Sequence, residues 1–274
     1  MPSMIDCMKR RVSVRTYDPA GLTSDQKNAI EGIARANSSG PFGNNVRIEV
    51  VDAGAAAGTE AKKFGTYGFI HGARCFIAGV VQNSPQAFFD FGYCFEKTVL
   101  ELTDMSLSCC WMALTYNAKG FLEKVKLEPN EALAVVAPVG TPSPARSIID
   151  RLVRVMARPR RRKPWARLFF DGEISVELSA QSAGKYATAL ECVRLAPSAS
   201  NYQPWRIVKA SSKDEYHFYA VRKGARTSGE LHVGIAMCHF ELAALELGCA
   251  GAWHVLADVP QAEGLDYFVS WAGA

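Results

Sequence analysis

Residues 194–205 read RLAPSASNYQPW, and the interpretation of the whole chain turns on this stretch. Small, hydroxyl-bearing and amide side chains followed by Pro and Trp are too polar for a strand and too punctuated for a helix interior. The stretch therefore predicts a loop between the helix-like segment before it and the strand-like WRIVKA after it. Residue types alone allow either a plain turn or a ligand-binding loop, so the rest of the chain has to decide.

The composition is that of an ordinary globular protein. The 274 residues are 49% hydrophobic and 21% charged, which suffices for one large core or two joined ones. The eight cysteines lie mostly in apolar surroundings and form no CxxC pair with metal-ligand spacing, which favours a reducing compartment. The N-terminus has no apolar signal region, and no uncharged apolar run approaches the roughly 18 residues of a spanning helix. We therefore expect a soluble cytoplasmic protein with no membrane partner.

Basic residues are clustered although the formal net charge is only +4. The clusters are MKRRVSVR near the start and RVMARPRRRKPWAR at residues 154–167, and both suit an anionic ligand. The longer one equally suits a solvated linker or a nucleic-acid patch, but the modest net charge and the lack of a DNA- or RNA-binding motif argue against nucleic acid. No Ser-His-Asp order, metal-ligand spacing or GxGxxG turn indicates hydrolase, metal or dinucleotide-fold chemistry.

Two amphipathic helices are predicted, each followed by a polar turn and a strand. The first begins at a capping box formed by Thr23 and Gln26, and the second begins after Ser179. Their apolar positions recur at three- and four-residue steps: Ala29, Ile30, Ile33 and Ala34 in the first, and Tyr186, Leu190 and Val193 in the second.

Two further helix-like segments, FGYCFEKTVLELTDMSLSCCWM and VGIAMCHFELAALELGCAGAWHV, are apolar nearly all round. They align without a gap when Gly92 is set on Gly234, which also superposes Trp111 on Trp253, since 234 − 92 and 253 − 111 are both 142. Helices of this kind are buried on most sides. The strand-like stretches EALAVVAPVG and LDYFVSWAG follow them. The chain is thus predicted to contain two diverged copies of one α+β unit, with a groove between the copies as the natural place for a site.

With this organisation established, APSASNYQPW closely resembles the signature loop of the nitroreductase-like flavoproteins, and RRVSVRTYD resembles their N-terminal Arg-x-Ser-x-Arg phosphate motif. The stretches GFIHGARCFIAGVV, ELGCAGAWHV, APVGTP and RRRKPWARLF add further agreement. Members usually have one unit per chain and form intertwined homodimers with FMN at the interface. The resemblance implies an α+β nitroreductase-like fold in which two copies form an intrachain pseudo-dimer with central helices and mixed or antiparallel sheets. The halves would be residues 1–168, with the basic linker, and 169–274, intertwined as one globular unit.

The resemblance also implies a set of cofactor-binding residues. FMN needs cations for its phosphate, polar loops for its hydroxyls and ring edges, and an apolar slot for its ring. The alternation in RVSVR would place two arginines and a serine on one side of an extended segment, where arginine can grip phosphate oxygens. The implied set is Arg11, Val12, Ser13, Arg15, Tyr67, Gly68, Ile70, Arg160, Arg162, Pro197, Ser198, Ala199 and Asn201.

The members of this set have different implied roles. Val12 stands where the family often has a basic or His residue, and it can still serve through its backbone. Arg160 and Arg162 match the second phosphate-contacting pair, and residues 197–201 would line the isoalloxazine. The stretch 67–70 would approach the pyrimidine edge, where Gly permits a backbone donor, although Tyr67 equally suits a core position.

Two histidines and two aromatic residues have less specific settings. His71 and His254 are single imidazoles near apolar neighbours, a setting more typical of structural hydrogen bonding, and we assign them no role. Trp165 and Phe169 either cover the cofactor or pack the linker.

The predicted function is an FMN-dependent oxidoreductase in which NADH or NADPH reduces the flavin, which then reduces a small electron-poor acceptor such as a nitroaromatic or a quinone. The flavin carries the chemistry, so neither a catalytic side chain nor a metal is expected. The alternatives are a module that stores or shields FMN without turnover, and a structural relic with an empty site. The motifs RVSVR and PSASNYQPW each occur once. Where the first copy would carry PSASNYQPW it has NSSGPFGNN, and where the second copy would carry RVSVR it has the acidic FDGEISVELS. We therefore expect one FMN per chain and a functional monomer. A higher oligomer is compatible with this expectation.

Overall fold

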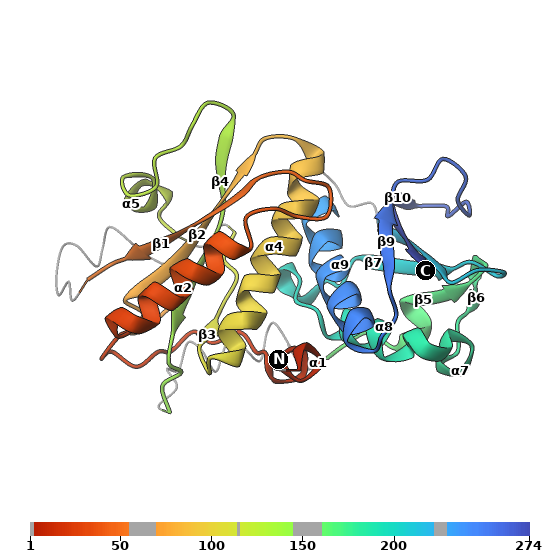
Figure 1. Ribbon diagram of the computed structural model, residues 1–274, viewed down its shortest axis with the longest axis horizontal. Coiled ribbons are helices and arrows are strands. Elements are labelled where there is room, and N and C mark those ends of the chain that lie inside the picture. The colour runs from red at the N-terminus through yellow and green to blue at the C-terminus, as the bar shows by residue number, and fades with distance from the viewer. Residues whose placement is uncertain (1–2, 55–69, 114–115, 145–160, 222–228) are drawn as a thin grey trace. The chain divides into compact units, whose positions relative to one another are not determined.

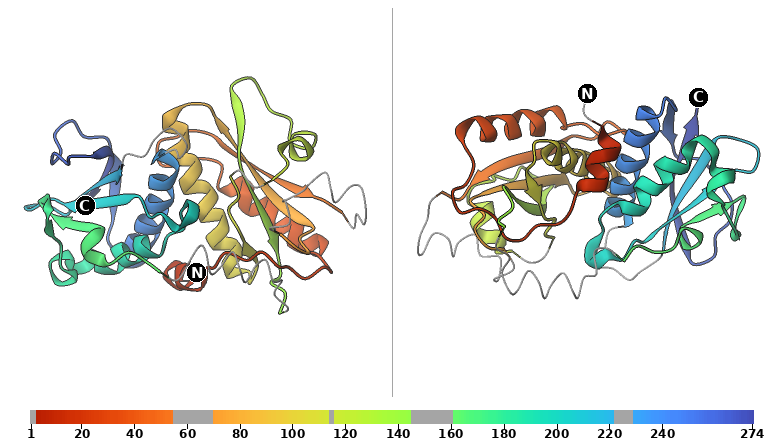
Figure 2. Two further views of the ribbon diagram at one scale, coloured as in Figure 1. Left: turned by 180° about the vertical axis from the view of Figure 1, so that it is seen from behind. Right: turned by 90° about the horizontal axis from the view of Figure 1, so that it is seen from below.

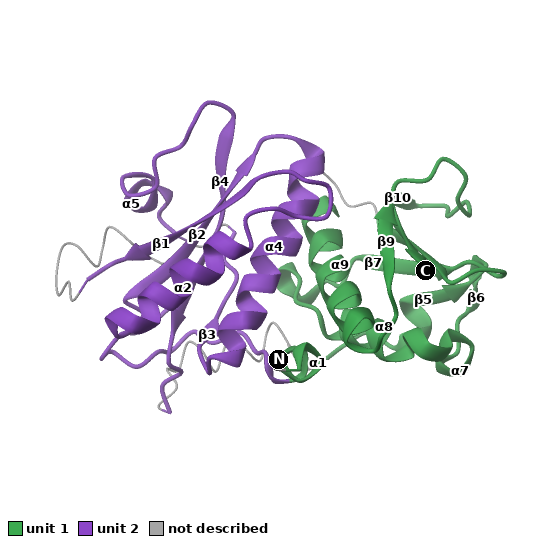
Figure 3. Ribbon diagram, in the orientation of Figure 1, with its two compact units in different colours: residues 1–9, 159–274 green, residues 10–158 purple. Residues whose placement is uncertain are grey.

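The computed structural model describes residues 3–54, 70–113, 116–144, 161–221 and 229–274. By its internal contacts the chain forms two compact units, which Figure 3 colours separately. The first-half unit comprises Arg10–Arg158, and the second-half unit comprises Met1–Lys9 together with Pro159–Ala274. The boundary expected at residues 168 and 169 lies inside the second-half unit.

The first-half unit is built on a four-stranded antiparallel sheet (Figure 1). Its strands run in the order β1 (Val46–Asp52), β2 (Cys75–Gln82), β4 (Glu131–Gly140) and β3 (Ser108–Cys109). Its helices are α2 (Ser24–Ala36), α4 (Pro85–Asp104) and the short α5 (Ala118–Leu122). Both faces of this sheet are covered, because a Cβ at Gly79 of β2 would strike Phe91 and Phe95 of α4, while Phe76 of β2 packs with Phe121 of α5. Burial on both faces explains why β2 is a continuous apolar run.

The second-half unit is built on a six-stranded mixed sheet, seen from two further sides in Figure 2. Its order is β6 (Glu173–Glu177), β5 (Phe169–Asp171), β7 (Trp205–Lys209), β8 (Glu215–Val221), β10 (Leu265–Gly273) and β9 (Gly251–His254). Only the β5–β7 pair is parallel among the described strands. The helices are α1 (Met4–Arg10), α7 (Ala180–Ala183), α8 (Ala187–Leu195) and α9 (Gly229–Glu246), with 3-10 turns η1 (Trp165–Arg167), η2 (Gly184–Tyr186) and η3 (Ala199–Asn201).

The two units share one topology. The order β1-β2-β4-β3 in the first sheet is matched by β7-β8-β10-β9 in the second, with antiparallel pairing throughout both sets. Each unit also has a Trp–Glu hydrogen bond, made from non-equivalent helix positions: Trp111 Nε1 donates to Glu96 of α4 at 2.8 Å, and Trp253 Nε1 donates to Glu241 of α9 at 2.7 Å. The predicted α+β fold with two diverged copies and mixed and antiparallel sheets is therefore confirmed.

The helices predicted from the sequence are present, but some of their ends and buried positions differ from the prediction. Thr23 and Gln26 make the predicted capping box at α2, whose Ile30 and Ala34 are buried, whereas Ala29 is exposed. The helix expected after Ser179 is broken at Gly184, which has φ +56° and separates α7 from α8.

The two apolar helices end earlier than their sequence patterns suggested. α4 ends at Asp104 and α9 at Glu246, so Trp111 and Trp253 lie beyond the helices, in or next to the edge strands β3 and β9. A run that is apolar all round does not mark its own end, because helix and buried strand look alike in such a run.

Candidate functional site

The segment that follows α1 carries the predicted phosphate motif and is held by backbone hydrogen bonds within the first-half unit. Val14 N donates to Cys109 O at 3.2 Å, His71 N donates to Arg15 O at 2.8 Å, and Tyr17 N donates to His71 O at 2.9 Å. The segment is thereby fixed to His71, which precedes β2, and to the end of β3.

Gly72 allows this close approach. Its φ is +76°, and a Cβ built on it would lie 2.2 Å from Tyr17 O, where no side chain fits. The motif therefore depends on a glycine that the sequence analysis did not single out.

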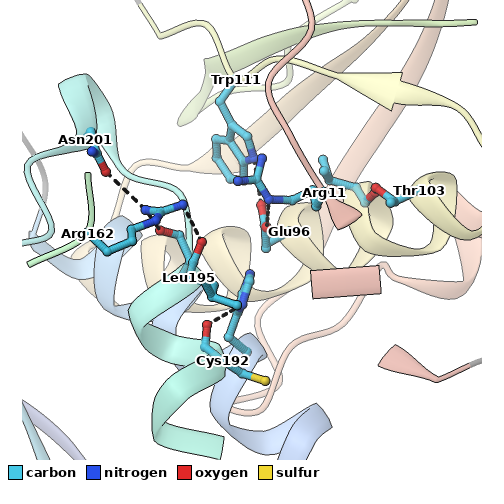
Figure 4. A network of polar contacts seen from close by, with 11 residues as sticks. Arg11, Glu96, Thr103, Trp111, Arg162, Cys192, Leu195 and Asn201 are labelled. Carbon is cyan, nitrogen blue, oxygen red and sulfur yellow. Dashed lines mark hydrogen bonds and ion pairs between the residues drawn. The ribbon is translucent and has the colours of Figure 1, made fainter. Parts of the chain in front are cut away.

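Arg11 is the most buried side chain of the motif. Its side chain is 6% exposed, and its Nε lies 3.6 Å from Oε1 of the fully buried Glu96 (Figure 4). That Nε has no hydrogen-bond partner, although Glu96 accepts a hydrogen bond from the indole of Trp111.

The neighbouring side chains also have unused donors. Within the described residues, the terminal nitrogens of Arg11, the Ser13 hydroxyl and the Arg15 guanidinium form no hydrogen bond, and Arg15 forms no ion pair. His71 Nε2 is buried without a partner, and the backbone pairing sets His71 opposite Thr16, the residue after Arg15. Of these atoms, only Arg11 Nε and His71 Nε2 are buried and unpaired, which is costly, whereas Ser13 and Arg15 are partly exposed. The donors of Arg11, Ser13 and Arg15 suit an acceptor-rich anionic ligand such as a phosphate. Sequence reasoning assigned His71 no role, and a lone histidine gave no signal for one.

The remaining predicted residues of this unit are placed unequally. Val12 has a side chain that is 49% exposed. Ile70 packs against the apolar cluster that includes Phe76 and Phe121. Tyr67 and Gly68 lie outside the described residues, as does Arg160 of the other unit.

The loop after α8 in the second-half unit is a strained turn. Ser200, Asn201 and Gln203 have φ of +50°, +55° and +49°, a region that residues other than glycine seldom occupy. Three such residues within four positions persist only where surrounding contacts fix them. Such strain marks a site candidate rather than an ordinary connecting turn.

Arg162 provides one of these contacts (Figure 4). Its guanidinium donates to Leu195 O at 2.6 Å, to Ala196 O at 2.8 Å and to Asn201 Oδ1 at 3.1 Å. The first two acceptors lie at the C-terminal end of α8, where carbonyls lack helical partners and a cation is favoured. Arg162 therefore ties the end of α8 to the loop.

Gln203 provides the other main contact, and sequence reasoning did not assign it. Its side chain is buried, its Oε1 accepts from Lys163 N at 2.7 Å, and its Nε2 donates to Asn201 O at 3.1 Å. Its own N–H donates to Ser198 Oγ at 2.8 Å. The signal lay in the sequence: a glutamine directly before Pro and Trp at a strand start is a polar residue in an apolar setting.

The loop is anchored from α9 as well. Ala199 N donates to Nε2 of the buried His232 at 3.2 Å, and Pro197 is buried. The structure thus brings together Arg162, Pro197, Ser198, Ala199 and Asn201 within one unit, and Arg11, Val12, Ser13, Arg15 and Ile70 within the other.

The aromatic and histidine residues considered earlier have mostly structural positions. The rings of Trp165 and Phe169 pack edge to face with centroids 4.5 Å apart, and Trp165 Nε1 donates to Leu178 O at 2.5 Å. His254 is exposed on β9. Trp165 and Phe169 therefore pack the start of the second-half unit.

Metal and thiol chemistry find no support in the described part of the chain. It contains no group of three or more His, Cys, Asp or Glu residues that could hold a metal ion. All eight cysteines are buried thiols. Burial raises the pKa of Cys75 to about 11 and those of Cys94 and Cys192 to about 12, so these thiols stay protonated and unreactive at neutral pH.

The sequence matches the family model described as "Putative TM nitroreductase" over residues 3–244. The chain belongs to this family. A structure of a "putative nitroreductase" from Thermotoga maritima MSB8 matches with a TM-score of 0.65 at 16% identity, covering 99% of this chain and 94% of that one. This likeness shows the nitroreductase fold along the whole chain.

Other solved structures match about half of the chain. An FMN-dependent nitroreductase from Clostridium difficile R20291 has a TM-score of 0.41 at 17% identity, covering 52% of this chain and 90% of that one. A "Putative NADH dehydrogenase/NAD(P)H nitroreductase" from Bacteroides thetaiotaomicron VPI-5482 has a TM-score of 0.43 at 22% identity, covering 54% of this chain and 90% of that one. The search of curated proteins returns no match. Among the described helices, none has the length and apolar character needed to span a bilayer.

Proposed function

We propose that this chain is an FMN-dependent oxidoreductase that takes electrons from NADH or NADPH and passes them to a small electron-poor acceptor such as a nitroaromatic or a quinone. Membership of a nitroreductase family supports the reaction class. The observation that carries the proposal is that donors of Arg11, Ser13 and Arg15 have no partner within the described residues of the first-half unit. A terminal phosphate, with a charge near −2, supplies the acceptors that these donors lack.

FMN, when bound, supplies the hydride and electron transfer. Arg11 and Arg15 would hold its phosphate, and their positive charge would favour an anionic ligand in this region. No side chain is required to act as an acid or base, because the flavin carries the chemistry.

The loop 197–201 would contribute mainly through its fixed shape. The polar atoms of Ser198 and Asn201 already bind Gln203 and Arg162 within their own unit. A loop locked in this way offers a flat ligand a preformed surface, which lowers the entropic cost of binding.

We further propose that the tandem arrangement gives one FMN per chain, because the motifs RVSVR and PSASNYQPW each occur once. The test is the molar ratio of bound flavin to protein in a monomeric size-exclusion fraction, with the released cofactor identified by mass. A ratio near one and the mass of FMN are expected. A ratio near two, or flavin held only by dimers, contradicts the tandem proposal, and absence of flavin binding contradicts the proposed cofactor.

A further inference from the structure

A fully buried carboxylate lies in the middle of α4. The Glu96 side chain is 0% exposed, its Oε2 accepts from Trp111 Nε1 at 2.8 Å, and its Oε1 lies 3.6 Å from Arg11 Nε. An ionised carboxylate is tolerated at such depth only when it is paired and hydrogen-bonded. Glu96 and Arg11 therefore compensate each other's charge.

This pairing leaves the donors of Arg11 largely unused. The separation of 3.6 Å is longer than a hydrogen bond, so Glu96 holds the guanidinium by electrostatic attraction alone. Arg11 Nε has no hydrogen-bond partner, and its terminal nitrogens have none within the described residues. Glu96 thus orients the guanidinium, whose N–H groups remain available to a second anion.

The second copy contains a similar Trp–Glu contact at a different helix position, because the 142-residue offset aligns Glu96 with Cys238 and Glu241 with Val99. There Trp253 Nε1 donates to Glu241 on α9 at 2.7 Å, but Glu241 forms no ion pair within the described residues. The Trp–Glu hydrogen bond therefore occurs in both copies, whereas an arginine joins it only in the copy that contains RVSVR. Glu241 is only partly buried and needs no counter-charge, whereas the fully buried Glu96 is paired with Arg11.

We propose that Glu96 is a positioning residue that holds Arg11 in place to bind the phosphate of FMN. The proposal rests on the proposed function and adds a residue outside both sequence motifs. Without the negative charge of Glu96, the nearly buried guanidinium of Arg11 would be uncompensated and would leave its position for solvent. The effect on the ligand must therefore act through its phosphate.

The test compares the dissociation constants of FMN and riboflavin, which lacks the phosphate, by titration of the full chain. Glu96→Gln keeps the size of the side chain and removes its charge, and Glu241→Gln makes the same change in the copy without the arginine. Glu96→Gln and Arg11→Ala are each expected to weaken FMN binding at least ten-fold, with riboflavin binding unchanged. Glu241→Gln is expected to leave both constants unchanged, and the Glu96→Gln/Arg11→Ala double variant is expected to bind like Arg11→Ala alone.

Three outcomes overturn the proposal. Unchanged FMN affinity in Glu96→Gln means that Arg11 does not depend on Glu96, and tighter FMN binding means that Glu96 competes with the phosphate. An equal loss for riboflavin assigns Glu96 a merely structural role. If Glu96→Gln does not fold, Glu96→Asp replaces it in the test, because Asp retains the charge but draws it away from Arg11. Glu96→Asp must then weaken FMN binding without weakening riboflavin binding. Failure of the wild type to bind FMN would instead refute the proposed function.

Discussion

Replacing Gly72 by alanine should displace the segment that carries Arg15, and Gly43 provides a matched control. Both glycines belong to the first-half unit and have nearly equal φ, +76° and +78°. Alanine at either position incurs the left-handed backbone penalty of about 1 kcal/mol. At Gly43 nothing lies within 4 Å of the added Cβ, so this penalty is the whole expected cost.

At Gly72 the added Cβ would lie 2.2 Å from Tyr17 O, so the two segments must separate. Separation breaks the hydrogen bonds from His71 N to Arg15 O and from Tyr17 N to His71 O, each with a net contribution of about 0.5–1.5 kcal/mol. The free energy of unfolding should therefore fall by about 2–4 kcal/mol in Gly72→Ala and by about 1 kcal/mol in Gly43→Ala.

Urea denaturation monitored by circular dichroism gives the free energy of unfolding of both variants. FMN titration of the folded variants then reports on the site: Gly72→Ala should weaken binding and Gly43→Ala should not. Equal stability losses in the two variants, or unchanged FMN affinity in Gly72→Ala, would refute the reasoning that this glycine positions the phosphate motif.

Further predictions concern single contacts and titration. Arg15→Ala should weaken FMN binding by about 1.5–3 kcal/mol, measured by titration, and an unchanged affinity would place the phosphate elsewhere. Gln203→Ala leaves Lys163 N without its acceptor and should lower the free energy of unfolding by about 1–3 kcal/mol in urea, whereas an unaltered midpoint would contradict the role of this side chain. Because burial raises the pKa of Cys75 from 9.0 to about 11 in the folded chain, its contribution to stability is full below pH 9 and is lost between pH 9 and 11. Urea midpoints of wild type and Cys75→Ala should converge over that range, and a constant difference would argue against the shift.

Much of the fold followed from local sequence signals. Thr23 and Gln26 fixed the start of α2, and the apolar steps at Tyr186, Leu190 and Val193 located the buried face of the second helical segment. These signals are reliable because capping and amphipathic periodicity act within one or two turns of chain.

Features that depend on distant contacts could not be predicted. The end of α4 at Asp104 falls inside an apolar run that does not mark it. The break at Gly184 differs, because glycine tolerates the positive φ there and nothing lies within 4 Å of a Cβ built on it. Ala29 shares the apolar stripe of α2 but is exposed, because the width of the buried face is set by what packs against it.

The candidate site shows the same division. The motifs led directly to Arg11, Arg15 and the loop 197–201, but Glu96 and Gln203 were missed, since a charged residue within an apolar helix and an amide before a proline acquire meaning only from partners remote in sequence. His71 was likewise undetectable, because its unpaired Nε2 is a property of the folded chain.

The most direct test of the account is anaerobic addition of NADH or NADPH to the purified chain loaded with FMN, followed by a nitroaromatic or a quinone. We expect the yellow absorbance to bleach with at least one of the two nucleotides and to return when the acceptor is added. Flavin that stays bound and yellow with both nucleotides would contradict the proposed oxidoreductase and identify a protein that holds FMN without turnover.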